Sequence, residues 1–139
     1  MTEDVTIHGA ADRPARTAPA SSFTGTVLQD PLVAASGSFA TSVTGVSFTP
    51  GARTNWHTHT SRQVLIATVG AGMVQVKGLP PHPLRPGDVA VVPPGVVHWH
   101  GAAPGSLFTH LSVVEGGVSG GTEWMEPVAE ADYRGAFVG

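Results

Sequence analysis

The stretch Gly51-Ala-Arg-Thr-Asn-Trp-His57-Thr-His59-Thr-Ser-Arg-Gln63 carries most of the information about fold and function in this chain. A second block reads Gly87-Asp-Val-Ala-Val-Val-Pro93-Pro-Gly95-Val-Val-His98-Trp-His100. Five of the seven histidines lie in these blocks or on the strand-like segment that follows them, at His110. Such a concentration indicates imidazoles that meet in the folded chain.

Strand periodicity predicts how these side chains meet. Residues i and i+2 of a strand share a face, so His57 and His59 point the same way, and so do His98 and His100. We expect residues 54–59 and 63–69 to form a hairpin in which Gln63 lies opposite His59. A further pair on one face is His110 and Ser112.

A metal ion is the simplest partner for such a cluster. Buried neutral imidazoles are costly unless their lone pairs are satisfied, and a metal satisfies them. A single histidine is more often an ordinary hydrogen-bonded residue. The two blocks together, with their glycine and proline spacing, favour a metal site.

Composition indicates one all-β domain. The chain has 139 residues, with 18 Gly and 12 Pro, which favours short antiparallel strands joined by tight turns in a sandwich or jelly-roll barrel. Only 12% of residues are charged, so we expect hidden surface and a homodimer or higher homo-oligomer. The net charge of -3 argues against nucleic acid as a partner. With no cysteine, no membrane-length segment and no secretory signal, we expect no membrane association and a cytoplasmic protein.

The chain divides into a short arm and one domain. Residues 1–22 lack periodicity and predict a flexible arm or an edge strand exchanged with a partner. Residues 23–139 predict a single domain of strands, with at most one short helix near residues 128–134.

The two blocks resemble the two motifs of the cupin superfamily, a family of jelly-roll barrels. Gly51, His57, His59 and Gly70 match the first motif, with Gln63 where most cupins have Glu. The second motif is matched by Gly87, Pro93, Gly95 and His98, whereas Ala102 stands in place of its final Asn.

A narrower resemblance is to small bacterial cupins with hydroxynitrile lyase activity, which belong to a group associated with carboxymuconolactone decarboxylases. It is carried by segments such as Trp56-His-Thr-His59, His98-Trp-His-Gly-Ala-Ala-Pro104 and Trp124-Met-Glu126. The resemblance implies one divalent metal ion, manganese first, with iron, nickel or zinc as alternatives. Its ligands would be His57, His59, Gln63 and His98, and the nearby catalytic histidines would be His100 and His110.

The glutamine has a chemical consequence. Three imidazoles and an amide are all neutral, so the ion would keep its full double charge and favour an anionic ligand such as cyanide or an alkoxide. Between Asp30 and Glu115 the sequence has one carboxylate, Asp88, in a turn context. We therefore expect His110 to act as the base, with His100 assisting, in cleaving a cyanohydrin to a carbonyl compound and cyanide.

The sequence gives the least information about the pocket for a small-molecule substrate. We expect Thr44, Val46, Arg62, Ser112 and Val114 to shape it, and Arg62 to meet an anionic substrate at its mouth, although a solvated turn residue is the commoner interpretation. Two alternatives remain open: a cupin dioxygenase or isomerase acting on another small substrate, and a non-catalytic module that binds a metal or a small anion.

Overall fold

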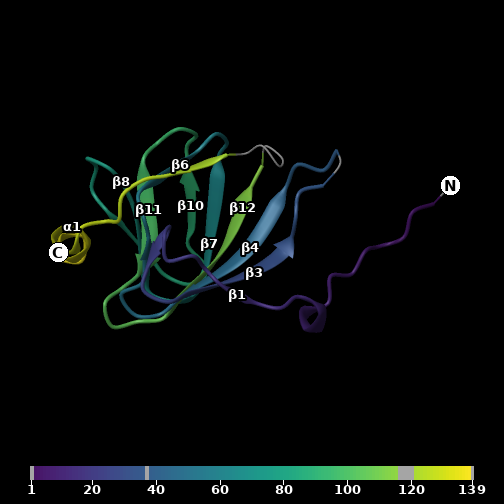
Figure 1. Ribbon diagram of the computed structural model, residues 1–139, viewed down its shortest axis with the longest axis horizontal. Helices are drawn as coiled ribbons and strands as arrows, with labels where there is room; N and C mark the ends of the chain where they lie inside the picture. The colour runs from purple at the N-terminus through teal and green to yellow at the C-terminus, as the bar shows by residue number, and fades with distance from the viewer. Residues whose placement is uncertain (1, 37, 116–120, 139) are drawn as a thin grey trace.

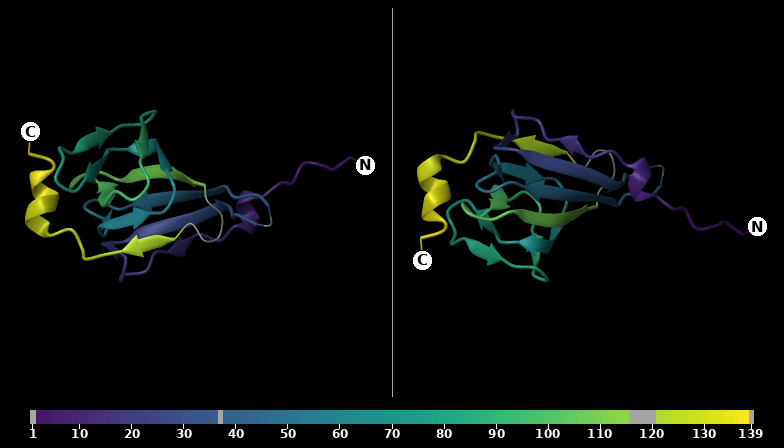
Figure 2. Two further views of the ribbon diagram at one scale, coloured as in Figure 1. Left: turned by 90° about the horizontal axis from the view of Figure 1, so that it is seen from above. Right: turned by 90° about the horizontal axis from the view of Figure 1, so that it is seen from below.

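Two antiparallel β-sheets pack face to face and enclose the histidine-rich segment. The computed structural model describes residues 2–36, 38–115 and 121–138. Figure 1 shows the sheets with the N-terminal segment extending from one end, and α1 (Glu130–Gly135) at the other end. The two views of Figure 2 show the same separation of the N-terminal arm from α1.

The first sheet holds the longer strands. Its order is β1 (Arg16–Thr17), β3 (Val27–Val33), β4 (Ser42–Phe48), β12 (Phe108–Val114), β7 (Gln63–Gly70) and β10 (Val89–Val92). Neighbours such as β4 and β12 are far apart in sequence, so the sheet is assembled by long crossovers between the two layers.

The second sheet is built from shorter pieces. Its order is β13 (Thr122–Trp124), β6 (His57–His59), β11 (His98–Ala102), β5 (Arg53–Thr54) and β2 (Phe23–Thr24), with β8 (Gly72–Val76) and β9 (His82–Leu84) alongside β11. Besides α1, the described residues contain a 3-10 turn, η1 (Ala10–Asp12). The predicted antiparallel all-β architecture with one short C-terminal helix is confirmed. No helix in the described ranges has the length and apolar character needed to cross a bilayer.

The predicted hairpin between residues 54–59 and 63–69 is wrong. Strand β6 pairs with β11 and β13, whereas β7 pairs with β12 and β10, so the two segments lie in opposite sheets. The turn between them carries the chain from one layer to the other. Gln63 therefore approaches the histidines from across the interior, not from a neighbouring strand.

The interior is apolar at one end and polar at the other. Direct cross-strand partners put Phe108, Phe48 and Val27 in one row across the first sheet, and all three are fully buried. Two residues along β12, His110 occupies the same face. The edge of the Phe48 ring meets the His100 ring, and the two centroids lie 5.9 Å apart. The rings of Phe48 and Phe108 therefore fill the interior of the barrel on one side of the histidines.

A second apolar cluster lies behind the second sheet. It contains Trp56, Met73, Trp99, Val128 and Tyr133, on the face opposite to the histidines. The Tyr133 hydroxyl of α1 donates to the Ala102 carbonyl at 2.6 Å. The side chains that alternate with the histidines along β6 and β11 therefore anchor those strands from behind.

Buried Arg53 fastens α1 to the second sheet. Its guanidinium donates to the carbonyls of Gly51 and Val128 and to the Glu130 carboxylate, at 3.0–3.1 Å. The same group lies 4.1 Å from the centre of the Tyr133 ring. Arg53 is only 5% exposed, and its buried charge is tolerated because these oxygens and the ring surround it.

Close backbone packing beside the site predicts a sharp glycine requirement. A Cβ at Gly101 would lie 2.6 Å from the Ala52 carbonyl oxygen and 2.5 Å from the Arg53 Cβ, so β11 and β5 would have to separate. We expect Gly101→Ala to lower the free energy of unfolding by about 2–3 kcal/mol. At Gly105 the added methyl group would meet no atom within 4 Å, so Gly105→Ala is the matched control. Denaturant unfolding of both variants is the measurement, and equal midpoints would contradict this packing.

Candidate metal centre and active-site cavity

The histidines reach one point from both sheets. His57 and His59 lie on β6, and His98 lies directly opposite His57 on the paired strand β11. His100 follows on the same face of β11, and His110 enters from β12 in the first sheet. All five side chains are buried, as the alternation of apolar and polar positions predicts.

The rings lie close enough to share an ion. One nitrogen each from His57, His98 and His100 lie within 4.8 Å of one another, so this trio could hold a metal. The ring centroid of His59 is 5.0 Å from that of His57 and 5.5 Å from that of His98. The Gln63 amide oxygen lies 3.2 Å from the Nε2 atom of His98. The four predicted ligands therefore meet, and His100 lies among them.

Hydrogen bonds fix which nitrogens are free. The Nδ1 atoms of His57 and His98 donate to the carbonyls of Asn55 and Val96, at 2.9 and 3.1 Å. Because a carbonyl only accepts, these Nδ1 atoms carry the proton, and each Nε2 atom presents a lone pair. For His59, the Nδ1 atom lies 3.0 Å from the Thr122 hydroxyl, and the buried Nε2 atom has no partner among the described residues.

Gln63 presents an unusual contact. Its Nε2 atom donates to the Ser112 hydroxyl at 2.8 Å, which turns its amide oxygen towards the lone pair on the Nε2 atom of His98. Two acceptors facing each other repel, and a cation between them removes the repulsion. With the amide turned over, Gln63 would instead donate to the Nε2 atom of His98.

Burial keeps the imidazoles neutral. Burial, together with a smaller effect of the neighbouring His98, lowers the pKa of His57 to about 2. Burial lowers the pKa of His98 to about 4, although the hydrogen bond to the Val96 carbonyl opposes the shift. It also lowers the pKa of His59. Neutral imidazoles with inward lone pairs are the form that binds a metal, so these residues fit a divalent ion.

His100 and His110 form a separate buried pair. The Nδ1 atom of His100 lies 2.9 Å from the Nε2 atom of His110. The outer nitrogens, Nε2 of His100 and Nδ1 of His110, have no partner among the described residues. When both rings are neutral, one proton lies between them, so one outer nitrogen carries a proton and the other a lone pair. Burial lowers the pKa of His110 to about 4 and that of His100 well below its usual value.

The cavity at this site has a volume of about 180 Å³. Its lining includes most of the residues predicted from the sequence: Thr44, Val46, His57, His59, Gln63, His100, His110, Ser112 and Val114. Arg62 is exposed and is not among the lining residues. Arg62 therefore does not line the cavity as expected, because the turn that carries it faces solvent.

Several lining residues were not anticipated from the sequence. They are Arg16, Phe23, Gln29, Thr54, Thr122 and Trp124. The ring centroid of Trp124 lies 4.6 Å from that of His57. Strand alternation was the one available signal, because Thr122 and Trp124 share one face of β13 and lie directly opposite His59 and His57 on β6.

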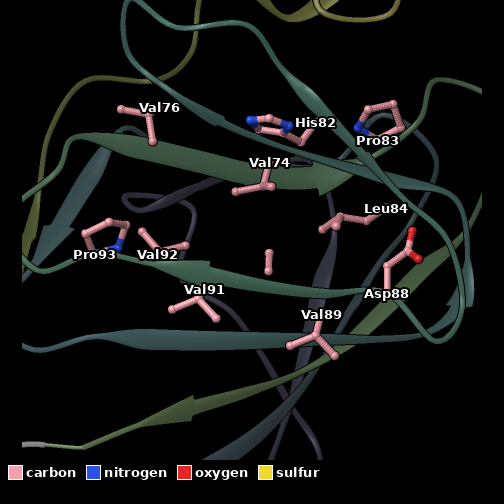
Figure 3. A pocket seen from close by; sticks show the side chains of 11 residues that line it. Val74, Val76, His82, Pro83, Leu84, Asp88, Val89, Val91, Val92 and Pro93 are labelled. Carbon is pink, nitrogen blue, oxygen red and sulfur yellow. The ribbon is translucent and has the colours of Figure 1, made fainter.

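A different cavity lies between β8, β9 and β10 and has a volume of about 430 Å³ (Figure 3). Figure 3 shows mainly valine side chains around it, among them Val74, Val91 and Val92. Its one carboxylate, Asp88, accepts a hydrogen bond from the Arg85 backbone at 2.8 Å and shapes a turn, as the sequence predicted. This larger hollow lacks the convergent polar groups of the histidine cavity.

Comparison with known proteins agrees with this geometry. Residues 46–114 match the cupin domain family. An (R)-mandelonitrile lyase from Granulicella tundricola is 46% identical over 116 residues, which are 84% of this chain and 88% of that protein. A cupin-like protein from Thermotoga maritima, whose crystal structure is known, is 40% identical and has a TM-score of 0.85 over 99% of both chains.

More distant structures share the fold alone. The polyketide cyclase RemF from Streptomyces resistomycificus is 16% identical, with a TM-score of 0.68 over 96% of this chain and 92% of that one. A family match over the two histidine blocks and a relative that covers most of the chain lead to one conclusion. This chain belongs to the cupin family.

Proposed function

We propose that this protein is a metal-dependent lyase that cleaves or forms cyanohydrins. The observation that carries the proposal is the cavity in which neutral imidazoles and an amide oxygen converge beside a second, linked histidine pair. The 46% identity to a bacterial (R)-mandelonitrile lyase supports the same reaction class.

His57, His59, Gln63 and His98 are the proposed ligands. Each of the three histidines places its Nδ1 atom against an oxygen, which leaves the Nε2 atom for the ion, as is usual for metal-bound imidazoles. The Nε2 atom of His100 is also free, and His100 lies in the trio that could hold a metal, but its Nδ1 atom contacts His110 and not an oxygen. We therefore assign His100 to the catalytic pair. Manganese is the proposed metal. When bound, a divalent ion with four neutral ligands would stabilise negative charge on oxygen or on cyanide.

The histidine pair is the proposed base. A hydroxyl proton of the cyanohydrin passes to the lone pair at one outer nitrogen of the pair. The electrons of the O–H bond form the carbonyl double bond, and the bond to the nitrile carbon breaks with its electron pair on cyanide. A proton shift between the rings then moves the positive charge to the other ring, whose outer nitrogen already carries a proton and can now give it to cyanide.

Metal removal tests the reaction class. We expect the protein purified with manganese to cleave mandelonitrile, to lose that activity after dialysis against a chelator, and to regain it when manganese is restored. Elemental analysis of the same samples gives the metal content. Bound metal without cleavage of any cyanohydrin would contradict the proposal and favour another cupin reaction.

A variant tests the base. We expect His110→Ala to keep its manganese content and to lower kcat by about 100-fold or more, because general base catalysis supplies about that factor. Thr109→Ala is the control, since Thr109 lies next to His110 on the opposite face of β12 and contacts Ser47. Thermal unfolding of both variants separates loss of the base from loss of the fold. Full turnover in His110→Ala would remove His110 from this role.

The pH dependence of metal affinity tests the ligands. Protons compete with metal only below the pKa of each imidazole, and burial lowers the pKa of His57 to about 2 and that of His98 to about 4. We therefore expect manganese affinity, measured by equilibrium dialysis, to change by less than about threefold per ligand pair between pH 7.5 and 5.5. Two imidazoles with the ordinary pKa of about 6.5 would weaken binding by about a hundredfold over that range. A loss of that size would contradict the buried geometry.

A further inference from the structure

The cavity of about 180 Å³ that contains the histidines is called the histidine cavity here. Of the residues that line it, Arg16 is the one with a permanent charge. It lies on the short edge strand β1, and the cavity lining contains no carboxylate. Neighbouring acidic side chains point elsewhere: Asp30 pairs with Arg13 at 3.0 Å on the other face of β3. Glu123 alternates with the lining residues Thr122 and Trp124 and therefore faces away from the cavity. A positive charge at this cavity is thus not neutralised by the residues around it.

The sheet register places Arg16 in line with the proposed base. Arg16 pairs with Gln29, Gln29 with Val46, and Val46 with His110, so four neighbouring strands carry one row of side chains. Directly opposed residues share a face of a sheet, and all four line the cavity. Three strand spacings of about 4.8 Å separate the backbones at the two ends of the row by about 14 Å. Arg16 therefore lies at one end of the cavity and the base at the other.

Gln29 steadies the guanidinium in this position. The Nε atom of Arg16 donates to the amide oxygen of Gln29 at 3.2 Å. Within the described ranges its two terminal nitrogens make no hydrogen bond and no ion pair. A guanidinium held at one atom, with its outer nitrogens free, is suited to bind a carboxylate through two hydrogen bonds.

We propose that the substrate of this enzyme carries a carboxylate and that Arg16 binds it at the end of the cavity away from the histidines. The substrate class is a small hydroxynitrile, or the corresponding aldehyde or ketone, with an acidic group about one aromatic ring away from the reacting carbon. A cavity of about 180 Å³ is smaller than the usual pocket for a drug-sized ligand and limits the substrate to a small molecule. This inference deepens the proposed function, since it assigns a substrate class to the same site. Arg16 takes the role that the sequence suggested for Arg62.

Paired substrates test the assignment. We compare kcat/KM for mandelonitrile and for 4-carboxymandelonitrile, which differ only in the acidic group. The manganese-loaded protein is expected to prefer the carboxylated compound by about tenfold at low salt, with a smaller preference at high salt because exposed charges are screened. In Arg16→Gln the ratio of the two values should fall to about one.

The matched control is Arg85→Gln. It removes the same charge from an exposed turn that does not line the histidine cavity, so it should keep the tenfold preference. Equal ratios in Arg16→Gln and Arg85→Gln would overturn the inference, because the preference would then come from the overall charge. No preference in the unmodified protein would overturn it as well.

A binding measurement separates this inference from the lyase proposal. Calorimetric titration with benzyl alcohol and with 4-(hydroxymethyl)benzoate measures affinity for an unreactive pair of ligands. Tighter binding of the carboxylate that is lost in Arg16→Gln would support the role of Arg16, even if no cyanohydrin is cleaved and the proposed reaction fails. Cleavage of mandelonitrile together with equal binding of both ligands would retain the lyase and reject the carboxylate site.

Discussion

Removal of five imidazoles from water is the constraint on which the rest of this structure depends. Each buried ring must remain neutral and must find a partner for each nitrogen, or it destabilises the fold. Backbone carbonyls and a hydroxyl satisfy one nitrogen on three of the rings, and the other two rings satisfy each other. The ring nitrogens that have no partner indicate a chemical role for these histidines, because stability alone would favour apolar side chains at these positions.

The two sheets contribute differently to this arrangement. The second sheet carries four of the histidines on short strands, which are supported from behind by Trp99, Tyr133 and the buried Arg53. The first sheet supplies longer strands with continuous register, and across them a row of side chains runs from His110 to Arg16. The second sheet therefore supplies three of the four proposed ligands, and the first sheet supplies Gln63 and sets the length and the charge of the space in front of them.

The sequence predicted the fold class and the residues that converge, because both depend on local rules: strand alternation, turn residues and motif spacing. It predicted the neighbours of Gln63 wrongly, since an antiparallel hairpin and a crossover between layers have the same local pattern. Arg16 could not be found this way, because its position depends on the pairing of β1 with β3. Arg62 is exposed, in line with the commoner interpretation as a solvated turn residue, because proximity in sequence to a proposed ligand does not determine the direction of a side chain.

The bond between Thr122 and His59 links residues 63 positions apart, and it has a consequence for the order of assembly. His57 and His59 of β6 come early in the sequence, whereas β13, which pairs with β6 and orients the His59 ring, is the last strand. The His59 ring is therefore oriented only after the final strand has docked, so the proposed set of four ligands depends on the last strand of the chain.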